Sequence, residues 1–369
     1  MFASGNHCPT SVQLVKATAR LYSGSQEMSR RTQLGVFVAV MFSLVVSLHL
    51  SLAVAQEVQT EIRARARVLN DIGPGLIAVK RDSSGRYFVA ASSANSIAIF
   101  SADSKRLGQI PPANLQDVSK DANNTPKISF IADFDLDATG HLVVADRGAN
   151  TVKVFDADGS LLSTTPIPAP SSVAALPGEE FAVTSLRYHW LMGIYAYADR
   201  LIRAVGEPAD FAKGLDPART PDLGRVSSDP AGNLYFAFSF LPVPTVRRFD
   251  RFGYAGNEIA LDEFSPEQHR RELFPVDAGD HPRPVRQQIN ALGVDPVTQE
   301  IWIAVGDELL RFDKDGARTG LYRTLSPAGA PLSTKLILVE PDRLLLGTEA
   351  WGIFDFARPA KASAASPSP

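Results

Sequence analysis

The chain has 369 residues, with 37 lysines and arginines against 40 aspartates and glutamates, a formal net charge of −3 and 45% hydrophobic residues. This composition supports a large buried core and excludes a disordered or collagen-like chain, and without an excess of basic charge a general nucleic-acid binder is not expected. The single cysteine, Cys8, excludes a disulfide framework, a cysteine-based zinc site and a redox pair of cysteines.

The first predicted element is an apolar helix over residues 34–55, which contains no charged residue and follows Arg30 and Arg31. A basic flank before such a run is typical of an export signal, and it keeps the N-terminus inside. The run closes with the letters AVA, so we expect signal peptidase to cut after Ala55, and Met28 is a second candidate start. An uncleaved anchor stays open, because the run is long enough to span a bilayer. Either way the remaining chain is expected outside the cytoplasmic membrane, periplasmic, secreted or membrane-anchored.

The rest of the chain repeats one phrase, in which an acidic or turn residue and a glycine-type turn precede an apolar strand. The six copies are RDSSGRYFVAAS (81–92), LDATGHLVVADR (136–147), ALPGEEFAVTS (175–185), SDPAGNLYFAFS (228–239), VDPVTQEIWIAV (294–305) and VEPDRLLLGTE (339–349). Downstream of each copy an apolar strand ends in an aromatic residue: Phe100, Phe155, Tyr197, Phe249, Phe312 and Phe354. Six units of one pattern indicate a repeat architecture.

Several copies continue into a second tight turn, as in FDADGSLLSTTPI and FDKDGARTGLYRTL, which is a hairpin signal. Each unit is therefore interpreted as four antiparallel strands, and no long helical pattern interrupts the repeats. Radially repeated four-stranded sheets form a β-propeller. The predicted fold is all-β: a six-bladed β-propeller of four-stranded antiparallel blades over residues 60–357, preceded by the apolar export or anchor helix.

The sixth copy offers only three strands before the chain ends. Residues 60–69, TEIRARARVL, alternate apolar and charged side chains and predict a strand with one buried face. We expect this strand to supply the missing outer strand of blade six and so to close the ring. A solvated, charged linker is the alternative. The small, polar, proline-containing tail over 358–369 is predicted to be disordered.

The second copy carries a family resemblance. Its sequence FDLDATGHLVVADRGANTVKVFDADGSLL (134–162) resembles an NHL repeat, and the matching residues are Asp137, Gly140, Val143, Val144, Ala145, Asp146, Asn150, Val152, Val154, Phe155 and Gly159. The first and fourth copies match more loosely, and the third and sixth are recognised mainly by their position in the repeat. The resemblance covers roughly residues 61–357. It implies the propeller fold and no particular reaction.

In a propeller, the short acidic turns share one face, whereas the longer loops between second and third strands share the other with the links between blades. Binding residues are usually drawn from such variable loops. The loop 185–192 is the most unusual, because arginine and aromatic residues, which commonly anchor partners, occur together in it. With residues of neighbouring loops it predicts a face that binds an acidic or aromatic ligand. These candidates are Arg147, Arg187, Tyr188, His189, Trp190, Arg286 and Trp351. The alternative is that they pack the loops of an inert scaffold.

The candidates for a metal site are weaker. Asp133 and Asp135 lie on one face of the predicted innermost strand, where they could hold a channel cation, but no distant glutamate stands in register to complete a calcium loop. The histidines are scattered, and no HExxH or nucleophile-elbow motif is present. Gluconolactonase-type propellers carry an early Glu-Gly-Pro-type segment, where this chain has Ile72-Gly73-Pro74.

We therefore expect an exported binding module without a cofactor, whose partner is a protein, a peptide or an envelope polymer. No nucleic acid is expected as a partner, and a membrane only through the N-terminal segment. The alternative is a metal-dependent hydrolase or lyase at the central channel, using Asp133, Asp135 and His189. A purely structural partner in an envelope assembly is a third hypothesis.

Overall fold

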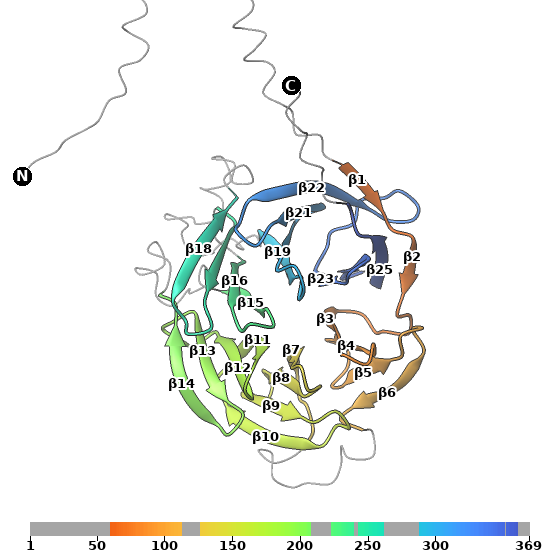
Figure 1. Ribbon diagram of the computed structural model, residues 1–369. Coiled ribbons are helices and arrows are strands. Elements are labelled where there is room, and N and C mark those ends of the chain that lie inside the picture. The colour runs from red at the N-terminus through yellow and green to blue at the C-terminus, as the bar shows by residue number, and fades with distance from the viewer. Residues whose placement is uncertain are drawn as a thin grey trace, which may run out of the picture. The chain divides into compact units, whose positions relative to one another are not determined.

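The computed structural model describes residues 60–112, 126–207, 223–239, 243–261, 288–350 and 352–360. Six β-sheets surround a central axis, and the first strand of each sheet lies innermost (Figure 1). Consecutive strands in each sheet pair antiparallel, so every blade runs from the centre to the rim. The predicted six-bladed propeller of four-stranded blades is confirmed.

The strands follow the repeats closely. Blades one to three are formed, from centre to rim, by β3 (Leu76–Arg81), β4 (Tyr87–Ala91), β5 (Ile97–Phe100) and β6 (Arg106–Ile110); β7 (Ile131–Leu136), β8 (Leu142–Asp146), β9 (Thr151–Phe155) and β10 (Leu161–Pro166); β11 (Pro170–Leu176), β12 (Glu180–Ser185), β13 (Met192–Ala196) and β14 (Arg200–Val205). Blades four and five are formed by β15 (Gly224–Ser228), β16 (Leu234–Phe238), β17 (Thr245–Phe249) and β18 (Ala255–Ala260); β19 (Ile289–Val294), β20 (Ile301–Val305), β21 (Glu308–Phe312) and β22 (Arg318–Leu325). Blade six contains β23 (Leu336–Val339), β24 (Arg343–Thr348), β25 (Gly352–Ala357) and, at the rim, β2 (Ala66–Val68).

The acidic residues of the repeated phrase close the turns. The Asp137 carboxylate accepts hydrogen bonds from the backbone N–H groups of Thr139 (2.8 Å) and His141 (2.9 Å), and Gly140 adopts a φ of +91° that favours glycine. The same arrangement recurs at Asp156, Asp229, Asp250 and Asp313. These aspartates are therefore repeated because each one caps a tight hairpin.

The core consists of six apolar clusters, each shared by two neighbouring blades. In β16, for example, Phe236 packs toward blade three whereas Tyr235 packs toward blade five. Successive side chains of a strand point to opposite faces, so a strand covered on both faces must be apolar along its length. This requirement explains continuous apolar segments such as YFVAA and LYFAF, which are buried throughout.

The ring closes differently from the prediction of one strand over 60–69. β1 (Thr60–Arg63) pairs parallel with β22 and adds a fifth strand to blade five, and only β2 pairs with β25 of blade six. Between them the backbone N–H of the buried Ala64 donates to the Leu325 carbonyl of blade five at 2.9 Å. The chain thus crosses from one blade to the next after Ala64, which splits the predicted strand in two.

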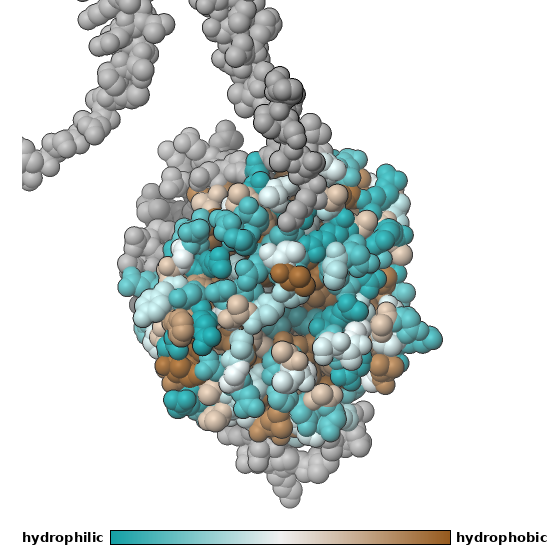
Figure 2. Space-filling view, in the orientation of Figure 1, coloured by the Kyte–Doolittle hydropathy of each residue, from teal (hydrophilic) through white to brown (hydrophobic). Residues whose placement is uncertain are grey.

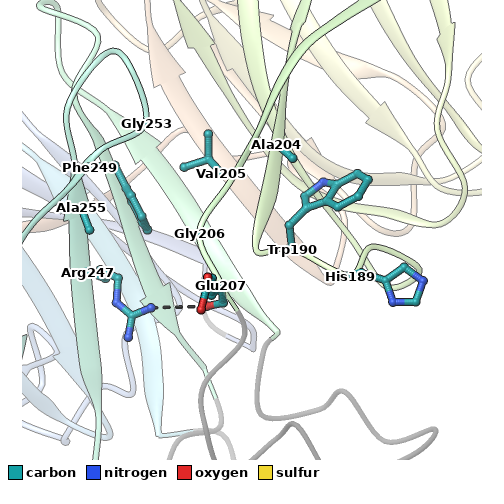
Figure 3. Close-up of a pocket in the computed structure, with 10 residues that line it drawn as sticks. All are labelled: His189, Trp190, Ala204, Val205, Gly206, Glu207, Arg247, Phe249, Gly253 and Ala255. Atoms are coloured by element: carbon teal, nitrogen blue, oxygen red, sulfur yellow. Dashed lines mark hydrogen bonds between the residues drawn. The ribbon is translucent and has the colours of Figure 1, made fainter.

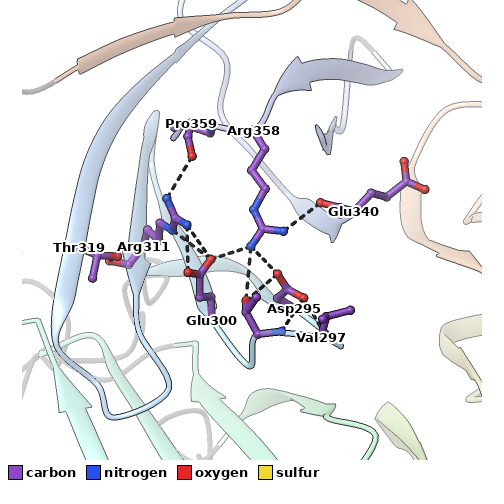
Figure 4. A network of polar contacts seen from close by, with 9 residues as sticks. Asp295, Val297, Glu300, Arg311, Thr319, Glu340, Arg358 and Pro359 are labelled. Atoms are coloured by element: carbon purple, nitrogen blue, oxygen red, sulfur yellow. Dashed lines mark hydrogen bonds and ion pairs between the residues drawn. The ribbon is translucent and has the colours of Figure 1, made fainter. Parts of the chain in front are cut away.

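The end of the described chain joins blades five and six (Figure 4). Arg358 pairs with Glu300 at 2.6 Å and with Asp295, and it donates to the Glu340 carbonyl at 3.1 Å. Arg311, itself buried, holds the other side of Glu300 at 2.8 Å. Residues 358–360, predicted to belong to a disordered tail, are therefore ordered by these contacts, and 361–369 lie outside the described residues.

The predicted export or anchor segment over 1–55, with its cleavage point after Ala55, also lies outside the described residues. Within the described ranges, no helix has the length and apolar character needed to cross a membrane. Seen along the ring axis, the propeller presents mostly hydrophilic side chains with scattered hydrophobic patches (Figure 2).

Candidate functional site

The loop between β12 and β13 presents two of its four candidate residues to solvent. Arg187 and His189 are exposed, whereas Tyr188 and Trp190 are half-buried. The structure therefore divides the predicted binding loop into residues that face outward and residues that pack against the blade.

Tyr188 belongs to the packed half. Its hydroxyl lies 2.7 Å from the Tyr195 hydroxyl of β13, and its ring lies 5.1 Å from the Trp190 ring, measured between centroids. Burial and the neighbouring Tyr195 hydroxyl both raise the pKa of Tyr188 well above its ordinary value. Tyr188 thus stays neutral at physiological pH and positions the loop.

A groove of about 500 Å³ begins beside His189 and Trp190 and follows the joint between blades three and four (Figure 3). Its other wall includes Arg247 and Phe249 of β17. Arg247 pairs with Glu258 at 2.8 Å and stacks over the Phe238 ring at 5.2 Å. An aromatic side chain and an arginine therefore face one concave surface, which is the combination that anchors partners in interfaces.

The two blades approach closely at the far end of this groove. Gly253, in the β17–β18 turn, has a φ of +85°, and a Cβ added to it would lie 2.7 Å from Cγ2 of Val205 in β14. Real Cβ atoms do not sit that close to another carbon, so only glycine fits here without displacement. The turn thus closes the groove against the neighbouring blade.

Arg147, another predicted binding residue, does not line this groove. Arg147 is half-buried: its Nε donates to the Pro170 carbonyl at 3.0 Å, and its guanidinium stacks over Phe130 at 5.9 Å. Burial lowers the pKa of Arg147 below its ordinary value. Through its bond to Pro170, Arg147 joins blade two to the first strand of blade three. Arg286 and Trp351 lie outside the described residues.

Asp133 and Asp135 lie on the innermost strand, as predicted, and face blade three. Asp133 accepts hydrogen bonds from the Ser172 hydroxyl (2.6 Å) and from its neighbour's backbone N–H, that of Phe134 (2.9 Å). Burial raises the pKa of Asp133 above its ordinary value, although Arg225 and Lys80 oppose the rise. A buried carboxylate that needs such donors helps to hold two blades together.

Asp135 is used in the same way. It accepts the Ala175 N–H at 3.0 Å and the Leu136 N–H at 2.9 Å, and it pairs with Lys80 of blade one at 2.8 Å. Each oxygen of the two aspartates thus already accepts a protein donor, and this donor set does not fit a divalent cation. Nowhere in the described ranges do three histidine, cysteine, aspartate or glutamate side chains gather in a metal-binding group.

A larger cavity, of about 760 Å³, lies at the centre of the face that carries the acidic turns. All six blades line it with the last residues of their innermost strands and the turns that follow. We call it the channel mouth. Sequence reasoning missed this cavity, because it assigned binding to the opposite face by loop length, and a central cavity formed by six short turns leaves no local signal.

No family model matches this chain, and no curated protein sequence matches it. Among solved structures it is similar to U3-55K (14% identity, 79% of this chain and 98% of that chain, TM-score 0.51). It is also similar to the WD40 repeats of RRP9 (15%, 78% and 79%, 0.50) and to a streptogramin B lyase (11%, 80% and 87%, 0.49). At these identities the likeness extends to the fold alone: the chain is a β-propeller protein.

Proposed function

We propose that this protein is an exported, NHL-type propeller that acts as a binding module through the loop 186–191 and the adjoining groove. Its partner is a protein, a peptide or an envelope polymer that offers acidic or aromatic groups. The observation that carries the proposal is the groove of about 500 Å³, which the candidate residues His189 and Trp190 line together with Arg247 of the next blade. Trp190 supplies rigid apolar area, and the exposed Arg187, three residues earlier in the same loop, supplies a charged donor.

The NHL assignment is supported by what the resembling residues do. Asp146 is fully buried and accepts the backbone N–H groups of Ser129 (3.0 Å) and Phe130 (2.9 Å) as well as the Lys153 ammonium (3.1 Å). Asn150 adopts a φ of +55° and its side chain accepts the Ala169 N–H at 2.9 Å. Both residues organise loop backbones, so the pattern that suggested the family has a structural reason in this chain.

The binding proposal is tested by partner capture with single variants of the full chain. Arg187→Ala and Trp190→Ala should each weaken binding of a captured partner at least tenfold, in line with the loss of an interface anchor. Arg106→Ala, which removes an exposed arginine from the rim of blade one, is the matched control and should leave binding unchanged. Equal binding by all three variants would place the interface elsewhere.

The proposed location is tested separately. Fractionation should find the protein outside the cytoplasmic membrane, and N-terminal sequencing should find Gln56 first if the export signal is cut after Ala55. Resistance to alkaline extraction, with an intact N-terminus, would show an anchor instead. Recovery of the full chain from the cytoplasm would contradict export in both forms.

The alternative of a metal-dependent hydrolase or lyase has less support. Its two candidate ligands already accept hydrogen bonds from blades two and three, with Lys80 beside them. Elemental analysis of the purified protein tests this directly: a stoichiometric divalent ion, whose removal lowers the melting temperature, would favour the enzyme over the binding module.

A further inference from the structure

The channel mouth has one apolar side, formed by blades five and six. Leu292 and Val294 of β19 and Leu338 of β23 line it and are partly exposed to it. Pro296 and Pro341, in the turns that follow these strands, extend the same surface. When an apolar group covers apolar surface inside a concave site, water is displaced from both surfaces and the free energy of binding becomes more favourable.

The cations that line the mouth are already neutralised by neighbouring carboxylates. Lys80 pairs with Asp135 at 2.8 Å. Arg81 pairs with the buried Glu340 at 3.1 Å. Neither side chain is therefore available as a strong site for an anion, since a second anion would have to displace a protein carboxylate.

Three carboxylates on the opposite side form no ion pair with a lysine or arginine of the described residues. Asp137, Glu179 and Asp229 lie in the turns of blades two, three and four, which are neighbours in the ring. Asp137 accepts the Tyr197 hydroxyl at 3.0 Å and contacts His141 at 2.9 Å. Asp229 accepts from Asn233 at 2.7 Å, from the Tyr235 hydroxyl at 3.3 Å and from backbone N–H groups. We call these three residues the acidic arc.

Glu179 is the most accessible member of the acidic arc. It ends the three-residue turn 177–179 between β11 and β12, in which Gly178 and Glu179 both adopt positive φ angles, +85° and +59°. The side chain is exposed, and within the described residues it forms no hydrogen bond and no ion pair. It is therefore free to pair with a ligand.

Two buried tyrosines report the negative field of this arc. Burial and the Asp229 carboxylate raise the pKa of Tyr235 to about 12. Burial, followed by the carboxylates of Asp137, Asp135 and Glu179, raises the pKa of Tyr197 still further. Burial is the largest cause of both shifts, and the nearby carboxylates add to it, although Arg248 opposes the rise at Tyr235.

We propose that the channel mouth binds a small organic cation with an apolar body, its ammonium group toward Glu179 and its body against Leu292, Val294 and Leu338. The charge of the acidic arc selects a cation, and the apolar side selects an organic one, because an inorganic ion would leave that surface uncovered. The site shares no lining residue with the groove beside Trp190, so it is independent of the function proposed above.

Calorimetric titration of the full chain with three probes of similar shape tests the proposal. Phenethylammonium should bind most tightly, the neutral 2-phenylethanol more weakly, and the anionic 3-phenylpropionate weakest of all. Added salt should weaken phenethylammonium binding, because it screens a partly exposed ion pair. Equal affinities for the ammonium and the carboxylate, or no binding of the ammonium, would overturn the proposal.

Two variants assign the halves of the site. Glu179→Gln should weaken phenethylammonium binding about fivefold and leave 2-phenylethanol unchanged, since an exposed ion pair contributes modestly. Leu338→Gln should weaken both probes. Asp315→Asn, an exposed carboxylate in the β21–β22 turn outside the cavity, is the control for charge and should change neither. The same effect from Glu179→Gln and Asp315→Asn would show that the protein's overall charge attracts the probe and that there is no specific site. Displacement of the probe by magnesium ion alone would show the same.

Discussion

The joint between blades five and six and the joint between blades three and four each contain an apolar cluster, and the first adds a buried network of charged side chains. At the joint between blades five and six, the buried Glu300 pairs with Arg311 at 2.8 Å and with Arg358 at 2.6 Å, and both of its carboxylate oxygens are used. Between blades three and four, an apolar cluster that includes Phe236 and Val205 does most of the packing, and arginines there donate to backbone carbonyls, as Arg203 does to Phe252 at 2.6 Å.

The difference follows from what each joint must do. The charged network ties Arg358, near the end of the described chain, to Glu300 of blade five, 58 residues earlier, and its directional bonds fix where that segment lies. The joint between blades three and four relies on its apolar cluster, and its rim is open as a groove. The charged network and the proposed binding groove thus lie at different joints of the ring.

The largest expected effect comes from breaking the charged network between blades five and six. Glu300→Ala leaves Arg311 buried and without its carboxylate partner, and we expect a loss of about 3–5 kcal/mol in the free energy of unfolding. Urea unfolding measures it. Arg65→Ala removes a half-exposed pair with Asp355 and should cost less than about 1 kcal/mol. A similar small loss for both variants would show that the buried network does not stabilise the joint between blades five and six.

The apolar joint should respond to added volume. Gly253→Ala combines a positive φ with a contact to Val205, and we expect a loss of about 2–3 kcal/mol. Gly140→Ala has a similar φ of +91°, but the nearest atom to its Cβ would lie 3.7 Å away, so only the conformational cost of about 1 kcal/mol applies. Thermal and urea unfolding of both variants compare the two directly, and equal losses would show that the close approach to Val205 is unimportant.

The contributions of Asp295, at the joint between blades five and six, and of Asp133, on the innermost strand of blade two, should change with pH in opposite directions. Burial raises the pKa of Asp295, but hydrogen bonds from Thr298, the backbone and Arg358 bring it below its ordinary value of 3.8. Its stabilisation is therefore present above pH 3.8 and is lost as the pH falls through the folded-state pKa. Burial raises the pKa of Asp133 instead, so its contribution is present below pH 3.8 and is lost as the pH rises through the folded-state pKa.

Unfolding free energies between pH 3 and pH 7 test both signs. Asp295→Asn should flatten the loss of stability on the acid side of about pH 4, and Asp133→Asn should remove a loss that develops as the pH rises above about 4. Asp315→Asn, a fully solvated surface change, serves as the reference profile. Two Asn variants that alter the profile in the same direction would contradict the opposite roles of the two carboxylates.

The smallest expected effect concerns the binding loop. Tyr188→Phe removes one hydrogen bond to Tyr195 and should cost about 1 kcal/mol or less. Because Tyr188 packs and does not face the groove, partner binding should be retained, in contrast to Trp190→Ala. Loss of binding with Tyr188→Phe, at unchanged stability, would place the hydroxyl in the interface.

The repeats were predictable because their causes are local. A capping aspartate such as Asp137 and a glycine such as Gly140 define a turn within five residues, and the apolar strand after them needs no distant partner to be recognised. The roles of the candidate residues were less predictable. Arg147 and Tyr188 are residue types common in binding surfaces, but here they form hydrogen bonds with the Pro170 carbonyl and the Tyr195 hydroxyl. Neither contact has a sequence signature.

By itself, the sequence determined the six blades, their four strands and the positions of the tight turns, because side-chain alternation and turn chemistry act over a few residues. Only the tertiary structure decided which carboxylates are neutralised and where the cavities lie. Glu300 and Arg358 are 58 residues apart, and Asp137 and Tyr197 are 60 apart. Such contacts depend on the angle at which one blade follows another, and that angle is the sum of packing across the whole ring.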